Sequence, residues 1–175
     1  MIHEVNGDIT LTAATAIAHG VAPNDHFNSG LALQLRERFP AMFKDFRHYG
    51  QISHPKAGDL WIWSGMGPEG PVHIISLFTQ EGGYEHGARP GRATIDHVNH
   101  ALRKLHKWAV EQKPASLALP RLATGVGGLD WTDVEPLVRE HLGSLPMPVI
   151  LYSTFRKGEH ADETPAFGAI RSPRR

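Results

Sequence analysis

The sequence contains no cysteine. This absence excludes disulfide bonds, cysteine nucleophiles and zinc sites built on thiolates. An excess of charge of one sign is also lacking, because 18 Lys and Arg residues balance 18 Asp and Glu residues, and a neutral chain does not hold duplex nucleic acid by charge alone. No apolar run approaches the roughly 20 residues that span a bilayer, and residues 1–8 lack the pattern of a signal peptide. We therefore expect a cytoplasmic protein without membrane contacts.

The length of 175 residues suits one domain, and a hydrophobic fraction of 41% suffices to bury a core. Strand and helix patterns alternate along the chain, which predicts an α/β domain with a mostly parallel sheet and right-handed crossovers. Residues 72–78 are almost continuously apolar, as is typical of a strand covered on both faces. Residues 58–64 are expected to pair with them as an antiparallel hairpin, which makes the sheet mixed. The clearest helical periodicity covers residues 93–112.

The segment from residue 156 onward is polar, contains two prolines and ends in two arginines. Such a composition favours a solvated chain over a packed element. We predict a domain over residues 1–155, followed by a flexible tail over residues 156–175.

Two loops bring polar or glycine-rich backbone to the start of a helix. Residues 28–30 precede an expected helix at 31–39, and residues 124–128 precede a second one near 132. Glycine lets a ligand approach closely, and unpaired N–H groups at a helix start attract anions. Both loops follow expected parallel strands, so they meet at the edge where open α/β sheets bind ligands. Two such loops suit two linked phosphates, although the glycines are also compatible with tight turns alone.

Other nucleotide-binding and metal-binding patterns fit poorly. The glycine loop has no Lys-Ser/Thr pair as in a P-loop, and it lies far from the first strand, where a dinucleotide fingerprint belongs. The 12 histidines suggest a metal hydrolase, with His97 and His100 three residues apart on the predicted helix. However, Arg103 and Lys104 lie between His100 and His106, as is typical of a solvated helix face. We predict no metal site and no cofactor.

Several residues outside the loops are candidates for ligand contacts. Asp8 follows the first expected strand and can accept a hydrogen bond from an exocyclic amine such as that of adenine, although it also suits a simple turn. Tyr152, at the end of the last strand, can stack on a base or pack in the core. His19 ends an expected strand, and we place it near the ligand together with Gly20 and Val21.

Three segments resemble the macrodomain family. They are residues 7–10 (Gly-Asp-Ile-Thr), the loop at 28–30, and residues 119–131 with their Pro-Arg…Gly…Gly-Leu-x-Trp pattern. The last segment is the specific one, and it is most similar to the branch with the terminal ADP-ribose protein glycohydrolases and the DNA ADP-ribosylation antitoxins. The resemblance covers residues 1–153. It implies a three-layer α/β/α sandwich around a mixed, mostly parallel sheet, and it implies ADP-ribose as the ligand.

The resemblance also implies a role for each segment along ADP-ribose. Asp8 is implied to hold the adenine amino group with Ile9 and Thr10 beside it, and Tyr152 to border the adenine or its ribose. The first loop is implied to line the distal ribose and one phosphate, and the second to wrap the diphosphate, so that a bulky residue at Gly127 would intrude on it. The loop residues concerned are Asn28, Ser29, Gly30, Leu31, Thr124, Gly125, Val126, Gly127, Gly128 and Leu129.

Catalysis is expected to proceed without the lysine that some hydrolases of this branch use as a covalent nucleophile. Gln80 stands at that place here, after the apolar strand, and an amide forms no Schiff base. The carboxylate that the family carries in the glycine loop is missing near Gly127 as well. We predict hydrolysis by a water molecule that Asn28 and Gln80 position and that the bound diphosphate orients or deprotonates.

The predicted activity is removal of mono-ADP-ribose from acidic side chains of proteins, because an ester has a good leaving group. O-acetyl-ADP-ribose is a chemically similar small substrate, and ADP-ribosylated nucleic acid is a further candidate. The alternative from another class is a non-catalytic reader that binds ADP-ribose or ADP-ribosylated partners.

Overall fold

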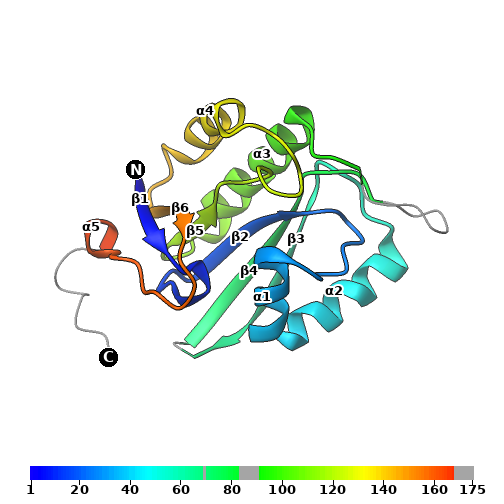
Figure 1. Ribbon diagram of the computed structural model, residues 1–175, viewed down its shortest axis with the longest axis horizontal. Coiled ribbons are helices and arrows are strands. Elements are labelled where there is room, and N and C mark those ends of the chain that lie inside the picture. Colours follow the sequence, from blue (N-terminus) through cyan, green and yellow to red (C-terminus); the bar gives the residue numbers. More distant parts are fainter. Residues whose placement is uncertain (69, 83–90, 168–175) are drawn as a thin grey trace.

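The computed structural model describes residues 1–68, 70–82 and 91–167. Figure 1 shows these residues as three layers, with a twisted sheet in the middle and helices on both of its faces. The sheet of the described residues has six strands in the order β1-β6-β5-β2-β4-β3. The strands are β1 (Ile2–Gly7), β2 (Ala16–Val21), β3 (Leu60–Gly67), β4 (Gly70–Phe78), β5 (Leu117–Pro120) and β6 (Val149–Phe155).

The sheet is mixed and mostly parallel. The pairs β1–β6, β6–β5, β5–β2 and β2–β4 are parallel, whereas β3 runs antiparallel to β4. This arrangement confirms the three-layer sandwich and the hairpin that the sequence predicts. Parallel neighbours need crossover connections, so the loops that follow β2, β4 and β5 all leave the same edge of the sheet. We refer to this edge as the carboxyl edge.

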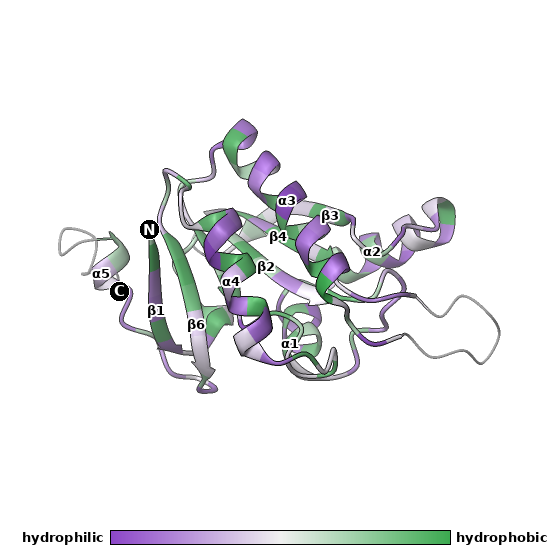
Figure 2. Cartoon of the chain, turned by 90° about the horizontal axis from the view of Figure 1, so that it is seen from above, coloured by the Kyte–Doolittle hydropathy of each residue, from purple (hydrophilic) through white to green (hydrophobic). Residues whose placement is uncertain are grey.

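Helices cover both faces of the sheet. On one face, Val98, Leu102 and Leu105 of α3 are fully buried, and each such side chain contributes about 1.5–3 kcal/mol to stability. In Figure 2 both colours alternate along α3 and α4, as expected of helices with one buried side. None of the helices within the described ranges is long and apolar enough to cross a membrane. The helices are α1 (Gly30–Arg38), α2 (Pro40–Ser53), α3 (Ile95–Gln112), α4 (Trp131–Leu142), α5 (Thr164–Phe167) and the 3-10 turn η1 (Ile9–Leu11).

Strand β4 is buried on both faces, as its apolar run predicts. Successive side chains of a strand point to opposite faces. Ile74 and Phe78 accordingly join the core under α1 and α2, whereas Ile75 and Leu77 join the core under α3 and α4. All four side chains are 0% exposed. Because both layers pack on this strand, Gln80, two residues after its end, is held at the carboxyl edge.

Residues 156–163 fold back against the domain, and we call this segment the strap. The amide of Arg156 donates to the carbonyl of Gly7 at 3.0 Å, and the amide of Asp8 donates to the carbonyl of Glu159 at 2.7 Å. Hydrogen bonds therefore cross the predicted boundary at residue 155. The polar composition of the strap indicates a flexible tail, but its backbone pairs with the loop after β1 and the short helix α5 follows it. Residues 168–175 lie outside the described part of the chain.

Candidate ligand site at the carboxyl edge

The first loop presents an uncapped helix start. Ser29 is the N-cap of α1 but makes no side-chain capping bond. Among the described residues, the amides of Gly30, Leu31 and Ala32 donate no hydrogen bond. Asn28, Ser29 and Gly30 are exposed, and Gly30 has a φ of +59°, a left-handed conformation that glycine adopts without strain. Unpaired amides and the helix dipole make this helix start attractive to an anion.

Phe27 anchors the first loop and is a residue that sequence reasoning missed. It is completely buried although its φ is +54°, a conformation that costs a bulky residue on the order of 1–3 kcal/mol. Its ring packs on those of Phe46, at a centroid distance of 4.8 Å, and His19, at 5.5 Å. Its amide donates to Asp25 Oδ1 at 2.7 Å. These contacts hold the strained turn, after which Asn28 is exposed to solvent.

The second loop contains several backbone amides that donate no hydrogen bond to the protein. Gly128 donates to the carbonyl of Gly125 at 3.1 Å, which closes a tight turn. Within the described part of the chain, the amides of Gly125, Val126 and Gly127 donate no hydrogen bond. The Val126 side chain is 81% exposed, whereas Leu129 packs against the core under α3 and α4. The turn therefore offers backbone donors, and Leu129 supports it from below.

Two arginines brace this second loop. The guanidinium of Arg121 lies over the ring of Trp131 at 5.3 Å, which ties the loop to the start of α4. The side chain of Arg92 donates to the carbonyl of Gly128 at 3.2 Å, and the amide of Ala93 donates to the carbonyl of Gly127 at 3.1 Å. Arg121 and Trp131 of the motif thus have a structural role. The role of Arg92 was not predicted from the sequence.

The structure corrects the reason why residue 127 must be glycine. A Cβ at Gly127 would lie 2.7 Å from the carbonyl oxygen of Ala123 and 2.9 Å from the Cβ of Ala93. Such a side chain therefore collides inside the protein before it could intrude on a diphosphate. A Cβ at Gly125, in contrast, has no atom within 4 Å. Gly125 is the position of this loop from which a side chain would extend into open space.

Asp8 caps the η1 turn after β1. Its Oδ1 accepts hydrogen bonds from the amide of Thr10, at 3.0 Å, and from the Thr10 hydroxyl, at 2.6 Å, and its Oδ2 accepts one from the amide of Gly158 at 2.8 Å. Burial opposes ionisation, but these hydrogen bonds outweigh it and lower the pKa of Asp8 below its usual value. Asp8 is therefore a carboxylate at neutral pH, and its neighbour Ile9 is buried.

Three predicted ligand contacts have their side chains in the core instead. His19 is 2% exposed, Val21 3% and Tyr152 4%, because their strand positions direct them toward the packed helices and loops. Nε2 of His19 lies 3.2 Å from Oγ of Ser76, and burial lowers the pKa of His19 to about 4. Gly20, beside it, packs so closely on the next strand's end that a Cβ there would lie 3.0 Å from Oγ1 of Thr79. In this structure these side chains offer a ligand almost no surface.

The two predicted catalytic residues differ in their surroundings. Asn28 is exposed, and its Oδ1 lies 3.5 Å from Nη1 of Arg36. Gln80 is only 6% exposed, and its Nε2 donates to the carbonyl of Gly91 at 2.7 Å. The Gln80 side chain thus joins the two ends of the segment between residues 80 and 91. Among the described residues, no group of three or more His, Asp or Glu side chains is arranged to hold a metal ion.

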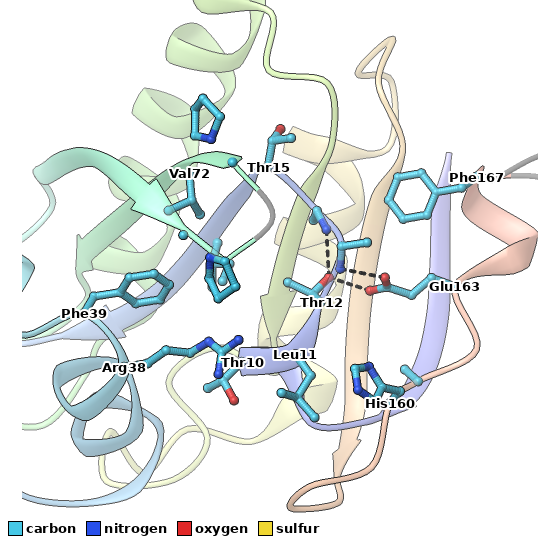
Figure 3. A pocket seen from close by; sticks show the side chains of 18 of the residues that line it. Thr10, Leu11, Thr12, Thr15, Arg38, Phe39, Val72, His160, Glu163 and Phe167 are labelled. Atoms are coloured by element: carbon cyan, nitrogen blue, oxygen red, sulfur yellow. Dashed lines mark hydrogen bonds between the residues drawn. The ribbon is translucent and has the colours of Figure 1, made fainter. Parts of the chain in front are cut away.

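A cavity of about 630 Å³ is lined by residues at the starts of β2 and β4 and by the C-terminal segment rather than by the two loops. In Figure 3, Arg38 and Phe39 approach it from α1, and Glu163 and Phe167 approach it from the C-terminal segment. Of the residues predicted to bind the ligand, Thr10 alone is among its lining residues. The cavity is therefore a neighbour of the Asp8 turn and not the cleft expected from the sequence.

Comparisons with known proteins agree with this geometry, although no family model matches the sequence. The DNA ADP-ribosyl glycohydrolase of Mycobacterium tuberculosis is 29% identical over 146 residues, which are 83% of this chain. The macrodomain of Mycobacterium tuberculosis DarG superposes with a TM-score of 0.77 at 27% identity, covering 88% of this chain and 99% of that one. The chain has the macrodomain fold.

This macrodomain spans 40% of the length of the Mycobacterium tuberculosis glycohydrolase. The structure of Thermosipho africanus DarTG in complex with ADP-ribose shares the fold, with a TM-score of 0.75 at 20% identity over 91% of this chain and 42% of that one. The resemblance noted from residues 7–10, 28–30 and 119–131 is thus confirmed at the level of the fold. The individual ligand contacts remain predictions.

The packing around the second loop predicts that alanine destabilises the fold at one glycine and has little effect on stability at another. We expect Gly127→Ala to lower the free energy of unfolding by about 1–3 kcal/mol, because its Cβ has no room. Gly125→Ala, the matched control in the same loop, should change it by less than about 0.5 kcal/mol. Urea denaturation of both variants measures the difference. Equal stabilities would contradict the placement of Gly127.

The burial of His19 predicts a pH dependence of stability. Its pKa of about 4 in the folded macrodomain lies below the value of about 6.5 in an unfolded chain, so the unfolded state takes up the proton first as pH falls. The contribution of neutral His19 to the free energy of unfolding is fully present above pH 6.5. It is lost as the pH falls toward 4, which lowers the free energy of unfolding by up to about 3 kcal/mol. Between pH 7 and 4.5, wild type should lose more unfolding free energy than His19→Gln. An identical loss in both proteins would refute this role of His19.

Proposed function

We propose that this macrodomain binds ADP-ribose along the carboxyl edge, with the diphosphate between the two loops. The observation that carries the proposal is the set of amides left unpaired within the described residues, Gly30 to Ala32 at the start of α1 and Gly125 to Gly127 in the second loop. Unpaired amides in two separate turns suit two linked phosphates. The fold shared with a protein whose structure contains ADP-ribose supports the same ligand.

We further propose that the macrodomain hydrolyses ADP-ribose from ADP-ribosylated DNA. Three relatives that each match 83% of this chain are named DNA ADP-ribosyl glycohydrolases, which favours DNA over the protein esters that we predicted from the sequence. With 18 basic and 18 acidic residues, the chain has little electrostatic hold on a long duplex. We therefore infer that recognition centres on the ADP-ribose group itself, and protein esters become the competing substrate class.

The proposed reaction uses a water molecule in place of a lysine. The oxygen of this water forms a bond to the anomeric carbon of the distal ribose while the bond from that carbon to the modified group breaks. The electron pair of the broken bond leaves with the modified group, which takes up a proton from solvent. The diphosphate accepts the proton of the water, and the exposed amide of Asn28 orients the water or a sugar hydroxyl. Gln80 acts as a positioning residue, because its amide holds the carbonyl of Gly91. No Schiff base can form at Gln80.

A specific observation favours the reader alternative. The amide of Gln80 is buried and already engaged with Gly91, so it is not aimed at open space in this structure. A macrodomain whose lysine position carries a structural glutamine would bind ADP-ribose without turning it over. The distinction is kinetic, and one assay separates the two functions.

Incubation with two matched substrates tests the proposal. One is an ADP-ribosylated oligonucleotide, and the other is a protein that carries mono-ADP-ribose on acidic side chains. We expect release of free ADP-ribose from the oligonucleotide, measured by chromatography. Saturable binding without release from either substrate would establish the reader, and release from the protein alone would return the sequence-based prediction. Gly125→Val serves as the control, because its side chain should block the diphosphate without disturbing the fold.

The position of Gln80 predicts an effect on turnover rather than on affinity. In Gln80→Ala the hydrogen bond to the carbonyl of Gly91 is lost, so Gly91 is no longer fixed at the carboxyl edge. We expect the rate of ADP-ribose release to fall by about tenfold, while the dissociation constant for ADP-ribose stays within about twofold. Single-turnover kinetics and calorimetry measure the two quantities. A variant with the wild-type rate would remove Gln80 from the reaction.

A further inference from the structure

The acceptor positions of Asp8 are almost fully used by the protein. A carboxylate offers about four acceptor positions, two on each oxygen. Oδ1 accepts two hydrogen bonds, both from Thr10, and Oδ2 accepts one, from the amide of Gly158. Within the described part of the chain one position therefore remains, and it lies on Oδ2. Since Asp8 is only 5% exposed, the direction from which a ligand can reach this oxygen is narrow.

The direction of that remaining position is set by the strap, residues 156–163. Gly158 donates to the carboxylate, while the adjacent Glu159 accepts from the Asp8 amide through its backbone carbonyl, at 2.7 Å. The strap lies so close to the turn that a Cβ at Gly7 would stand 2.8 Å from the amide nitrogen of Ala161. Both the side chain and the backbone of Asp8 are thus held by one segment.

A single carboxylate fastens the end of the strap. Glu163 Oε2 accepts hydrogen bonds from the Tyr152 hydroxyl and the Thr12 hydroxyl, each at 2.5 Å, and Oε1 accepts one from the amide of Ala13 at 2.9 Å. Figure 3 shows Glu163 reaching across to Thr12 from the C-terminal segment. Burial, reinforced by Glu163, raises the pKa of Tyr152, so its hydroxyl remains a donor. Glu163 thus joins the strap to β6 and to the segment after η1.

We infer that Glu163 is a positioning residue for base selectivity: by anchoring the strap, it keeps the Gly158 amide on one position of Asp8 Oδ2 and the other position open to the exocyclic amine of adenine. This inference rests on the proposed binding of ADP-ribose. It also gives Tyr152 a role other than stacking on the base, because Tyr152 acts through Glu163. If the strap is released, Oδ2 can rotate or bind water, and the amine loses its fixed acceptor.

Binding of two ligands that differ in the base tests the inference. ADP-ribose carries the amine, whereas inosine diphosphate ribose carries a carbonyl in its place. We expect wild type to bind ADP-ribose more tightly than inosine diphosphate ribose. In Glu163→Ala the ratio of the two dissociation constants should shrink by roughly tenfold, since one hydrogen bond to a charged group is lost. Isothermal titration calorimetry measures both dissociation constants.

A second glutamate of the same strap provides the matched control. The Glu159 carboxylate is 64% exposed and lies 3.9 Å from Arg156, and only its backbone carbonyl touches Asp8. Glu159→Ala keeps that carbonyl and should retain the wild-type preference. If Glu163→Ala fails to fold, Tyr152→Phe removes one donor to Glu163 and keeps the ring in the core, and it should narrow the preference as well.

The outcomes separate this inference from the proposed function. Failure of wild type to bind either ligand would overturn the proposed function. Binding of ADP-ribose by wild type, with an equal loss of affinity for both ligands in Glu163→Ala, would show that Glu163 has a purely structural role and would overturn the inference alone. Equal affinities of wild type for the two ligands would also overturn it, because Asp8 would then not read the amine.

Discussion

Unpaired backbone amides at one edge of a parallel sheet are the feature on which the rest of the site depends. Backbone N–H groups of a folded protein nearly always donate a hydrogen bond. Within the described residues, however, the N–H groups at the start of α1 and in the 125–127 turn have no acceptor. The parallel order of β5, β2 and β4 brings both turns to the same edge, so the charge they attract is shared.

Turns that present unpaired amides require rigid support, and side chains packed against the two loops supply it. Phe27 holds the first loop through its buried ring, while Arg121 on Trp131 and Arg92 on the Gly128 carbonyl hold the second. Gly127 is small because Ala123 and Ala93 close around it. Preorganised donors bind without the entropic cost of ordering a loop, which explains why so much of this motif is structural.

A different buried polar residue stands at each end of the carboxyl edge. At one end the side-chain amide of Gln80 donates a hydrogen bond to the carbonyl of Gly91, and no lysine stands at this position. At the other end Asp8 keeps its charge because Thr10 and Gly158 donate to it. Three hydrogen bonds fix the orientation of the Asp8 carboxylate. A carboxylate of fixed orientation suits recognition of a base rather than a catalytic role. The same constraint applies to Glu163, whose oxygens receive three donors of their own.

The order of strands and helices, the hairpin of β3 and β4 and the family were all readable from local pattern, because hydrophobic periodicity and the 119–131 motif involve neighbours in sequence. The positions of Asn28 and the glycine turn at one edge followed from strand direction alone. Tertiary structure decided which candidates face outward. His19, Val21 and Tyr152 pack in the core, and Gln80 closes a loop, because strand register and distant partners such as Ser76 and Gly91 set their directions. The strap was beyond prediction for the same reason: its hold on Asp8 is made by backbone groups and by one glutamate more than a hundred residues away from Thr12.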